Sequence, residues 1–260
     1  MFEKASGHFY KHWIMTLKSP AEMAWILVYP FVGLISIGLF ASFLIGSGAP
    51  LESLIFVFAG VMIWNFYDLS QHAITYGITY EIWSDSLKHF FSTTSTNNDY
   101  ILGNSMYGLF ISSSSLVIVG TIGFIIFGFN IFSAGIYLVL GSLSVFLFAS
   151  SIGLIINYFM ITKNVKYMSL IWMSTGIIMI FSGVYYPVSV LPGFAQSIAY
   201  MLPSTHAIEG IRLALMNDFT GANLSIYSSF VLSVIFFVLG YFAFKRGVDK
   251  GRELGKIARY

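Results

Sequence analysis

Long apolar runs alternate with short polar interruptions along this chain of 260 residues. A helix that crosses a membrane needs about 20 mostly apolar residues. By this rule the pattern predicts an all-α integral membrane protein with a single transmembrane domain. Its six transmembrane helices are expected at residues 23–45, 53–78, 105–127, 131–159, 168–186 and 224–244.

The composition agrees with a membrane protein and excludes several kinds of chemistry. Hydrophobic residues make up 57% of the chain and charged residues 9%, whereas roughly a quarter of the residues of a soluble domain are charged. The net charge of +2 gives no reason to expect nucleic acid as a partner. Cysteine is absent, which excludes disulfides and sulfur metal ligands. We also expect no cleavable signal peptide at the N-terminus.

A helix that lies in the membrane interface is predicted before the first crossing, at residues 5–20. Phe9, Trp13 and Leu17 alternate there with lysines in the spacing of an amphipathic helix. We expect Pro20 to end this helix, and Pro30 to kink the crossing that follows.

The second crossing is the most polar one, because its second half contains Asp68 and His72 on one helical face. A carboxylate at membrane depth is costly unless it is paired or hydrated. The two residues therefore form either a polar pair in a translocation pathway or a group near the cytoplasmic headgroups. Both interpretations stay open at this stage.

The third and fourth crossings are joined by a turn at residues 128–130 and are expected to form a tight hairpin. Gly141, Ser144 and Ser151 of the fourth crossing are small enough to permit close helix packing.

The longest polar interval, residues 80–104, is predicted to contain a short amphipathic helix. Leu87, Phe90 and Phe91 form its apolar stripe, and Asp99 is suited to cap the crossing that follows. This helix is either a connector on the membrane surface or a contact surface for a soluble partner.

No charged residue lies between Lys166 and Glu209, and three prolines interrupt this stretch. The stretch is too long for one crossing, and proline breaks a helix interior. We therefore expect residues 187–217 to form an outer re-entrant hairpin, with short helices at about 193–202 and 204–217. The alternative is an apolar extracellular loop. The prolines are Pro187, Pro192 and Pro203.

The distribution of basic residues predicts the orientation. With six crossings, Arg212 falls on one side of the membrane and the other twelve lysines and arginines fall on the opposite side. Basic residues favour the cytoplasmic side. Both termini, including the tail at residues 245–260, are thus expected in the cytoplasm of a multi-pass protein of the plasma membrane.

No motif for nucleotide hydrolysis or metal binding appears. The chain lacks a glycine-rich phosphate loop, and its five histidines are scattered, so we expect no metal site and no ATP hydrolysis. His206, Glu209 and Arg212 repeat at intervals of three residues and are expected on one helical face. Glu209 and Arg212 are best interpreted as a structural ion pair.

Two segments resemble the permease subunits of ABC type-2 exporters, a family that includes drug, lipo-oligosaccharide, O-antigen and teichoic-acid transporters. The segment 182–212 ends in a P-x-[ST]-x-x-x-E-x-x-R pattern, which is similar to the family's outer motif. The segment 81–103 resembles the family's first cytosolic loop, although it has fewer basic residues and no proline near Thr94. The residues that match the outer pattern are Pro203, Thr205, Glu209 and Arg212.

The resemblance implies a mechanism. Two permease copies, as a homodimer or with a related permease, would form a pathway in the lipid membrane. Two separate ATPase subunits would bind ATP and Mg, so this chain would carry no cofactor of its own. Leu87, Phe90 and Phe91 would dock into the ATPase as a coupling helix.

The substrate stays open between drug-like, lipid-linked and glycan cargo. The 26 Phe and 16 Tyr residues would suit an amphipathic or sugar-bearing substrate. Two other classes of function are an intramembrane enzyme, using His206 with Glu209 or Asp68 with His72, and a scaffold or channel without energy coupling.

Overall fold

The chain forms a bundle of long helices. The computed structural model describes residues 2–48, 50, 52–84 and 96–253, and these residues contain no strand. Five of the described helices are long and apolar enough to cross a membrane. These five are α2 (Pro20–Gly46), α3 (Glu52–Trp83), α5 (Asn97–Phe127), α6 (Ile136–Thr162) and α10 (Phe219–Glu253).

Seven shorter elements complete the described chain. An N-terminal helix precedes α2, and the others lie between α5 and α10. They are α1 (Phe2–Lys18), η1 (Ile131–Ala134), η2 (Val165–Ser169), α7 (Leu170–Phe181), η3 (Val188–Val190), α8 (Gly193–Ala199) and α9 (Pro203–Leu215).

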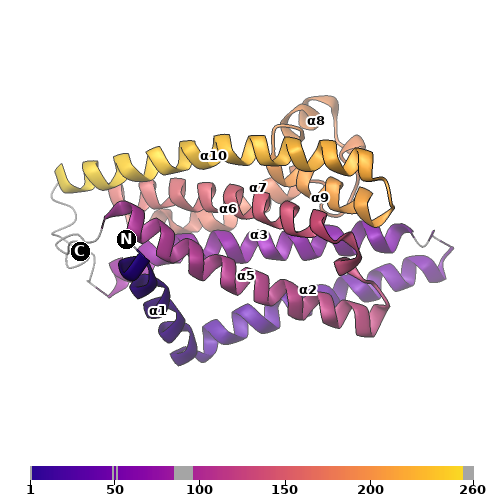
Figure 1. The fold of residues 1–260 in the computed structure, drawn as a ribbon, viewed down its shortest axis with the longest axis horizontal. Coiled ribbons are helices and arrows are strands. Elements are labelled where there is room, and N and C mark those ends of the chain that lie inside the picture. Colours follow the sequence, from indigo (N-terminus) through magenta and orange to yellow (C-terminus); the bar gives the residue numbers. More distant parts are fainter. Residues whose placement is uncertain (1, 49, 51, 85–95, 254–260) are drawn as a thin grey trace.

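The long helices run side by side, with α3 at the centre of the bundle (Figure 1). Helix α3 packs on α5, α6 and α2, and α10 packs on α6 and α9. Most of α3 and α6 is buried, whereas α2 and α10 are largely exposed. Helix α1 and the end of α10 lie at one end of the bundle, and α8 and α9 lie toward the other (Figure 1). The two ends therefore carry different short elements.

Helix α1 ends two residues earlier, and α2 begins three residues earlier, than the sequence predicts. Helix α1 ends at Lys18, and Ser19 has an extended backbone and accepts a hydrogen bond of 3.3 Å from the amide of Glu22. Pro20 begins α2 instead of ending α1. Its missing N–H is not needed in a first helical turn, and its fixed φ angle suits that position.

Helices α3 and α5 extend beyond their predicted ends at residues 78 and 105. Helix α3 continues to Trp83, and α5 begins at Asn97. Thr96 is the N-cap of α5, and its side chain and that of Asp99 form a capping box. Asp99 thus takes part in the cap as the third residue of α5. Leu87, Phe90 and Phe91 lie outside the described residues.

The small residues of α6 pack against α10, so the expectation of a tight hairpin with α5 is wrong. The hydroxyls of Ser144 and Ser229 lie 2.7 Å apart, and Ser233 donates to the carbonyl of Ser144 at 2.7 Å. A Cβ at Gly240 would meet the carbonyl oxygen of Ser151 at 2.7 Å. Helix α3 takes the place beside α6 that the sequence analysis gives to α5.

The apolar run at residues 168–186 does not form one continuous helix. It starts in the 3₁₀ turn η2, continues as α7 and leaves the helix at Ser182. Gly183 has a φ angle of +65°, a conformation that glycine adopts without strain. This turn ends α7 five residues before the sequence analysis ends the crossing.

Candidate functional site

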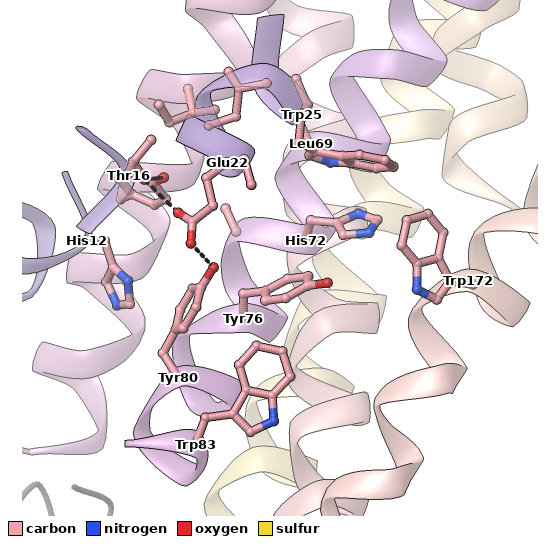
Figure 2. Close-up of a pocket in the computed structure, with 15 residues that line it drawn as sticks. His12, Thr16, Glu22, Trp25, Leu69, His72, Tyr76, Tyr80, Trp83 and Trp172 are labelled. Atoms are coloured by element: carbon pink, nitrogen blue, oxygen red, sulfur yellow. Dashed lines mark hydrogen bonds between the residues drawn. The ribbon is translucent and has the colours of Figure 1, made fainter. Parts of the chain in front are cut away.

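A pocket of about 340 Å³ lies where α1, α2, α3, α5 and α7 meet (Figure 2). Helix α1, which contributes His12 and Thr16 to its lining, lies at one end of the bundle (Figure 1). Its lining is dominated by aromatic rings. The lining residues are His12, Thr16, Ala21, Glu22, Trp25, Ile26, Leu69, His72, Ala73, Tyr76, Tyr80, Trp83, Tyr107, Ile111 and Trp172.

One face of α3 supplies a row of four rings to the pocket: His72, Tyr76, Tyr80 and Trp83. Their spacing of four, four and three residues places them above one another on a helix. The rings of His72 and Tyr76 are stacked with centroids 5.7 Å apart, and those of Tyr76 and Tyr80 are also 5.7 Å apart. The row therefore forms a continuous aromatic wall.

Two tryptophans from other helices continue this wall. Trp25 of α2 and Trp172 of α7 meet edge to face with centroids 5.3 Å apart. The His72 ring lies between them and Tyr76 (Figure 2). The side chains of Trp83 and Trp172 are 56% and 46% exposed, so the pocket is open at these rings.

Of the described residues that line the pocket, Glu22 is the one acidic residue, and none is a lysine or arginine. The Tyr80 hydroxyl donates a hydrogen bond to Oε1 of Glu22, and Thr16 donates to Oε2 at 3.3 Å (Figure 2). The Tyr80 bond joins the first turn of α2 to the last turn of α3. The pocket thus holds one fixed negative group beside its rings.

His72 is oriented by Asp68, one turn earlier on α3. Its Nδ1 lies 3.3 Å from the Asp68 carboxylate and 2.8 Å from the Asp68 carbonyl oxygen. Both neighbours are oxygens, so Nδ1 is the nitrogen that donates. Nε2 of His72 is buried and has no hydrogen-bond partner in the described part of the protein. Asp68 itself is buried behind the pocket wall and does not line it.

Helix α1 closes the pocket on another side. His12 is 4% exposed, and burial lowers the pKa of its imidazole to about 4. Thr16 and Tyr107 are joined through their hydroxyls, which connects α1 to α5. Lys11 forms an ion pair with Glu81, which connects α1 to the end of α3. Helix α1 is therefore attached to both helices that flank residues 85–95.

Gln71 attaches α7, and with it Trp172, to α3. Its amide nitrogen donates to Ser174 at 2.8 Å, and its amide oxygen accepts from Thr175 at 2.9 Å. Side-chain hydrogen bonds of this kind stabilise helix contacts in membranes.

The prolines of the predicted outer segment stand at the starts of its short helices. Pro187 is the N-cap of η3, Pro192 is the N-cap of α8, and Pro203 is the first residue of α9. Thr205, also in the first turn of α9, is buried and donates a weak bond of 3.4 Å to the carbonyl of Phe181. These residues shape the segment, whose helices α8 and α9 lie toward the end of the bundle away from α1 (Figure 1).

Arg212 is buried and binds backbone carbonyls. It donates two hydrogen bonds to Phe56 of α3, and one each to Gly183 and Val184, at distances of 2.8 to 3.0 Å. Glu209 is half-exposed, and its carboxylate lies 3.9 Å from Arg212. Burial lowers the pKa of Arg212 to about 10, so it keeps its charge at neutral pH. The sequence analysis expected Glu209 as the main partner, and the carbonyls take that role.

His206, Glu209 and Arg212 do not converge on a common point. Nε2 of His206 lies 2.9 Å from the carbonyl oxygen of Tyr200, while Arg212 is directed toward α3. In the described ranges, no group of three or more His, Asp or Glu residues is placed to hold a metal ion.

The aromatic wall is the part of the site that the sequence analysis missed. The wall could have been predicted in part from the spacing of its residues on α3, because this spacing places them on one helical face. These residues are His72, Tyr76, Tyr80 and Trp83. Trp25 and Trp172 carried no such signal, since only the packing of α2 and α7 brings them to α3.

Comparison with known proteins identifies one family. The family model described as "ABC-2 type transporter" matches residues 4–216, which include the pocket and the outer segment. A search among curated proteins finds no significant match.

Proposed function

The chain belongs to the ABC-2 type transporter family, and from this premise we propose that it is the permease subunit of an ATP-driven exporter in the plasma membrane. The family consists of transmembrane components of ABC transporters, so the chain is a multi-pass membrane protein whose role is to provide a pathway. Two copies would form that pathway, as a homodimer or with a related permease. ATP and Mg would be bound by two separate ATPase subunits.

The observation that carries this proposal is the aromatic pocket beside α1, within the family match. The pocket lies between three of the helices that are apolar enough to span the membrane, α2, α3 and α5. Two of its lining residues, Trp83 and Trp172, are exposed. A pathway for an amphipathic or lipid-linked substrate needs such an apolar opening within the membrane bundle.

Six crossings follow if η2 and α7 together span the membrane. Their combined length is about 28 Å, close to the hydrocarbon thickness of about 30 Å. Helix α6 ends near α1, whereas α8 and α9 lie toward the other end of the bundle, so α7 carries the chain between them (Figure 1). Under this scheme both termini are cytoplasmic, as the basic residues also favour.

The segment from Pro187 to Asn217 would then lie at the outer face and enter the bilayer without crossing it. Phe194 and Met201 are 74% and 67% exposed. Large apolar side chains at these exposures are stabilised by lipid or protein rather than by water. Arg212 supports the arrangement, because it satisfies carbonyls that would otherwise be costly at membrane depth.

Energy coupling is proposed to pass through residues 80–104. Leu87, Phe90 and Phe91 would dock into the ATPase subunit. Closure of the ATPase pair would move this loop, which α3 and α5 connect directly to the pocket. The ion pair of Lys11 with Glu81 would transmit the same movement to α1.

The proposal is tested by purifying the chain alone and together with a co-expressed ABC ATPase. The chain alone should show no ATP turnover, and the complex should hydrolyse ATP with a mass of two permeases and two ATPases. Replacement of Phe90 and Phe91 by Asp should abolish co-purification, whereas replacement by Leu should retain it. ATP hydrolysis by the purified chain alone, or a complex that tolerates the Asp substitutions, would contradict the proposal.

A further inference from the structure

The aromatic wall of the pocket offers ring faces on several sides. His72, Tyr76 and Trp172 approach one another from two helices, and Trp83 continues the row with its centroid 5.9 Å from that of Tyr80. The faces of Trp and Tyr rings carry partial negative charge, so they attract cations as well as apolar groups.

The fixed charge of the pocket is negative, like the partial charge on the faces of its rings. Glu22 is the only carboxylate among the described lining residues, and none of these is a lysine or arginine. Lys11, next to the lining residue His12 on α1, is paired with Glu81. The two lining histidines, His12 and His72, are buried. A ligand that matches this lining has one positive charge.

The polar side chains around Glu22 are bonded to one another. Thr16 is bonded to Tyr107 and Glu22, and the Tyr80 hydroxyl is bonded to Glu22. Nε2 of His12 and Nε2 of His72 have no partner in the described ranges. Rings make up most of the remaining lining, so the pocket suits an apolar body with a single charged group near Glu22.

We infer that the pocket binds a lipophilic organic cation, with its apolar body against the aromatic wall and its charge near Glu22. This inference rests on the permease function proposed above and specifies the chemical class of its substrate. The half-exposed Trp83 and Trp172 place the opening where such a ligand could enter from the inner half of the bilayer.

The test compares two ions of the same shape and opposite charge. The full chain in nanodiscs of zwitterionic lipid is equilibrated with labelled tetraphenylphosphonium or tetraphenylborate, and binding to empty nanodiscs is subtracted. We expect saturable binding of the phosphonium only. Glu22→Gln, which keeps the shape and removes the charge, should weaken binding about tenfold. Glu52→Gln is the matched control, because Glu52 is an exposed carboxylate outside the pocket, and it should bind like the wild type.

A second variant separates a loss of binding from a loss of folding. Trp83 is more than half exposed, so Trp83→Ala should leave the melting temperature unchanged and weaken phosphonium binding several-fold. Equal binding of the two ions would overturn the inference, and so would equal affinities of the Glu22 and Glu52 variants. A further outcome is that a neutral glycolipid, and not the phosphonium, stimulates ATP hydrolysis by the complex of the chain with its ATPase. The permease function would then hold, and the inference of a cationic substrate would be wrong.

Discussion

The guanidinium of Arg212 on α9 donates two hydrogen bonds, of 3.0 and 2.8 Å, to the single carbonyl oxygen of Phe56 on α3. Its charged carbon also lies 3.5 Å from the centroid of the Phe56 ring. The remaining donors bind Gly183 and Val184 in the turn after α7. One buried side chain thereby joins three segments that are far apart in the sequence.

Replacement of Arg212 by Lys should destabilise the protein by about 2 kcal/mol. Lysine keeps the charge but has a compact head group, so it cannot serve three carbonyls in different directions. At least one buried carbonyl would lose its partner, which costs about 1 to 3 kcal/mol. The measurement is thermal unfolding in detergent.

Glu209→Gln is the matched control for Arg212→Lys. The Glu209 carboxylate is half-exposed and 3.9 Å from Arg212, so its removal should change stability by less than about 0.5 kcal/mol. An equal loss of stability in both variants would mean that the ion pair, rather than the carbonyls, holds α9.

Gly60→Ala should be one of the most destabilising alanine substitutions in α3. A Cβ at Gly60 would lie 2.1 Å from the carbonyl oxygen of Val184 and 2.6 Å from Nη2 of Arg212. Both atoms are held in place by their mutual hydrogen bond, so relief requires a backbone shift that costs about 1 to 3 kcal/mol. Gly176→Ala in α7 serves as the control, because nothing lies within 4 Å of its added Cβ. A melting temperature of the Gly60 variant at or above that of the Gly176 variant would show that the backbone at Val184 can shift without a loss of stability.

The apolar pattern predicts an all-helical membrane protein, and five of its six expected crossings overlap helices long and apolar enough to span a membrane. Its errors have identifiable causes. Hydropathy registers lipid-facing residues, so it ended the second crossing at Ile78, although α3 continues to Trp83 through contacts with α1. The apolar run also continues past Gly183, so hydropathy predicts a helix at a position where the backbone turns. Small residues in α6 were recognised, but the sequence does not say which neighbour they face.

The candidate site was predicted only in part. Arg212 was recognised by its motif, yet its carbonyl partners on Phe56 and Val184 have no sequence signature, because every residue has a carbonyl. Asp68 and His72 were paired by their spacing within one helix, and they lie in contact. Trp25 and Trp172 reach the same pocket from α2 and α7, and only the tertiary packing brings them there.

The stability of the protein should fall as the pH drops from about 6.5 toward 4, because of His12. Burial lowers the pKa of His12 to about 4, whereas the unfolded chain titrates near 6.5. Between these values the unfolded state binds the extra proton. Stability is therefore complete above pH 6.5 and is lost as the pH falls, by on the order of 2 kcal/mol at pH 5.

Melting temperatures between pH 7.5 and 5 measure this effect of His12. His12→Gln should flatten the profile, although a smaller slope should remain because burial also lowers the pKa of His8. A His12→Gln profile as steep as that of the wild type would assign the acid sensitivity to other groups.

Single cysteines can test the crossing number directly, because the natural chain has no cysteine to remove. Three exposed residues are suitable: Tyr10 in α1, Thr220 in the first turn of α10 and Asp249 near the C-terminal end of α10. With six crossings and cytoplasmic termini, a membrane-impermeant maleimide should label Thr220→Cys in intact cells. It should label Tyr10→Cys and Asp249→Cys only after permeabilisation. If α7 does not cross, the chain has five crossings, and exactly one of the two terminal positions would be labelled from outside. Labelling of both terminal positions from outside, with protection of Thr220→Cys, would mean six crossings in the reverse orientation. The aromatic pocket would then lie at the outer face. Cargo could not enter it there from the cytoplasmic leaflet.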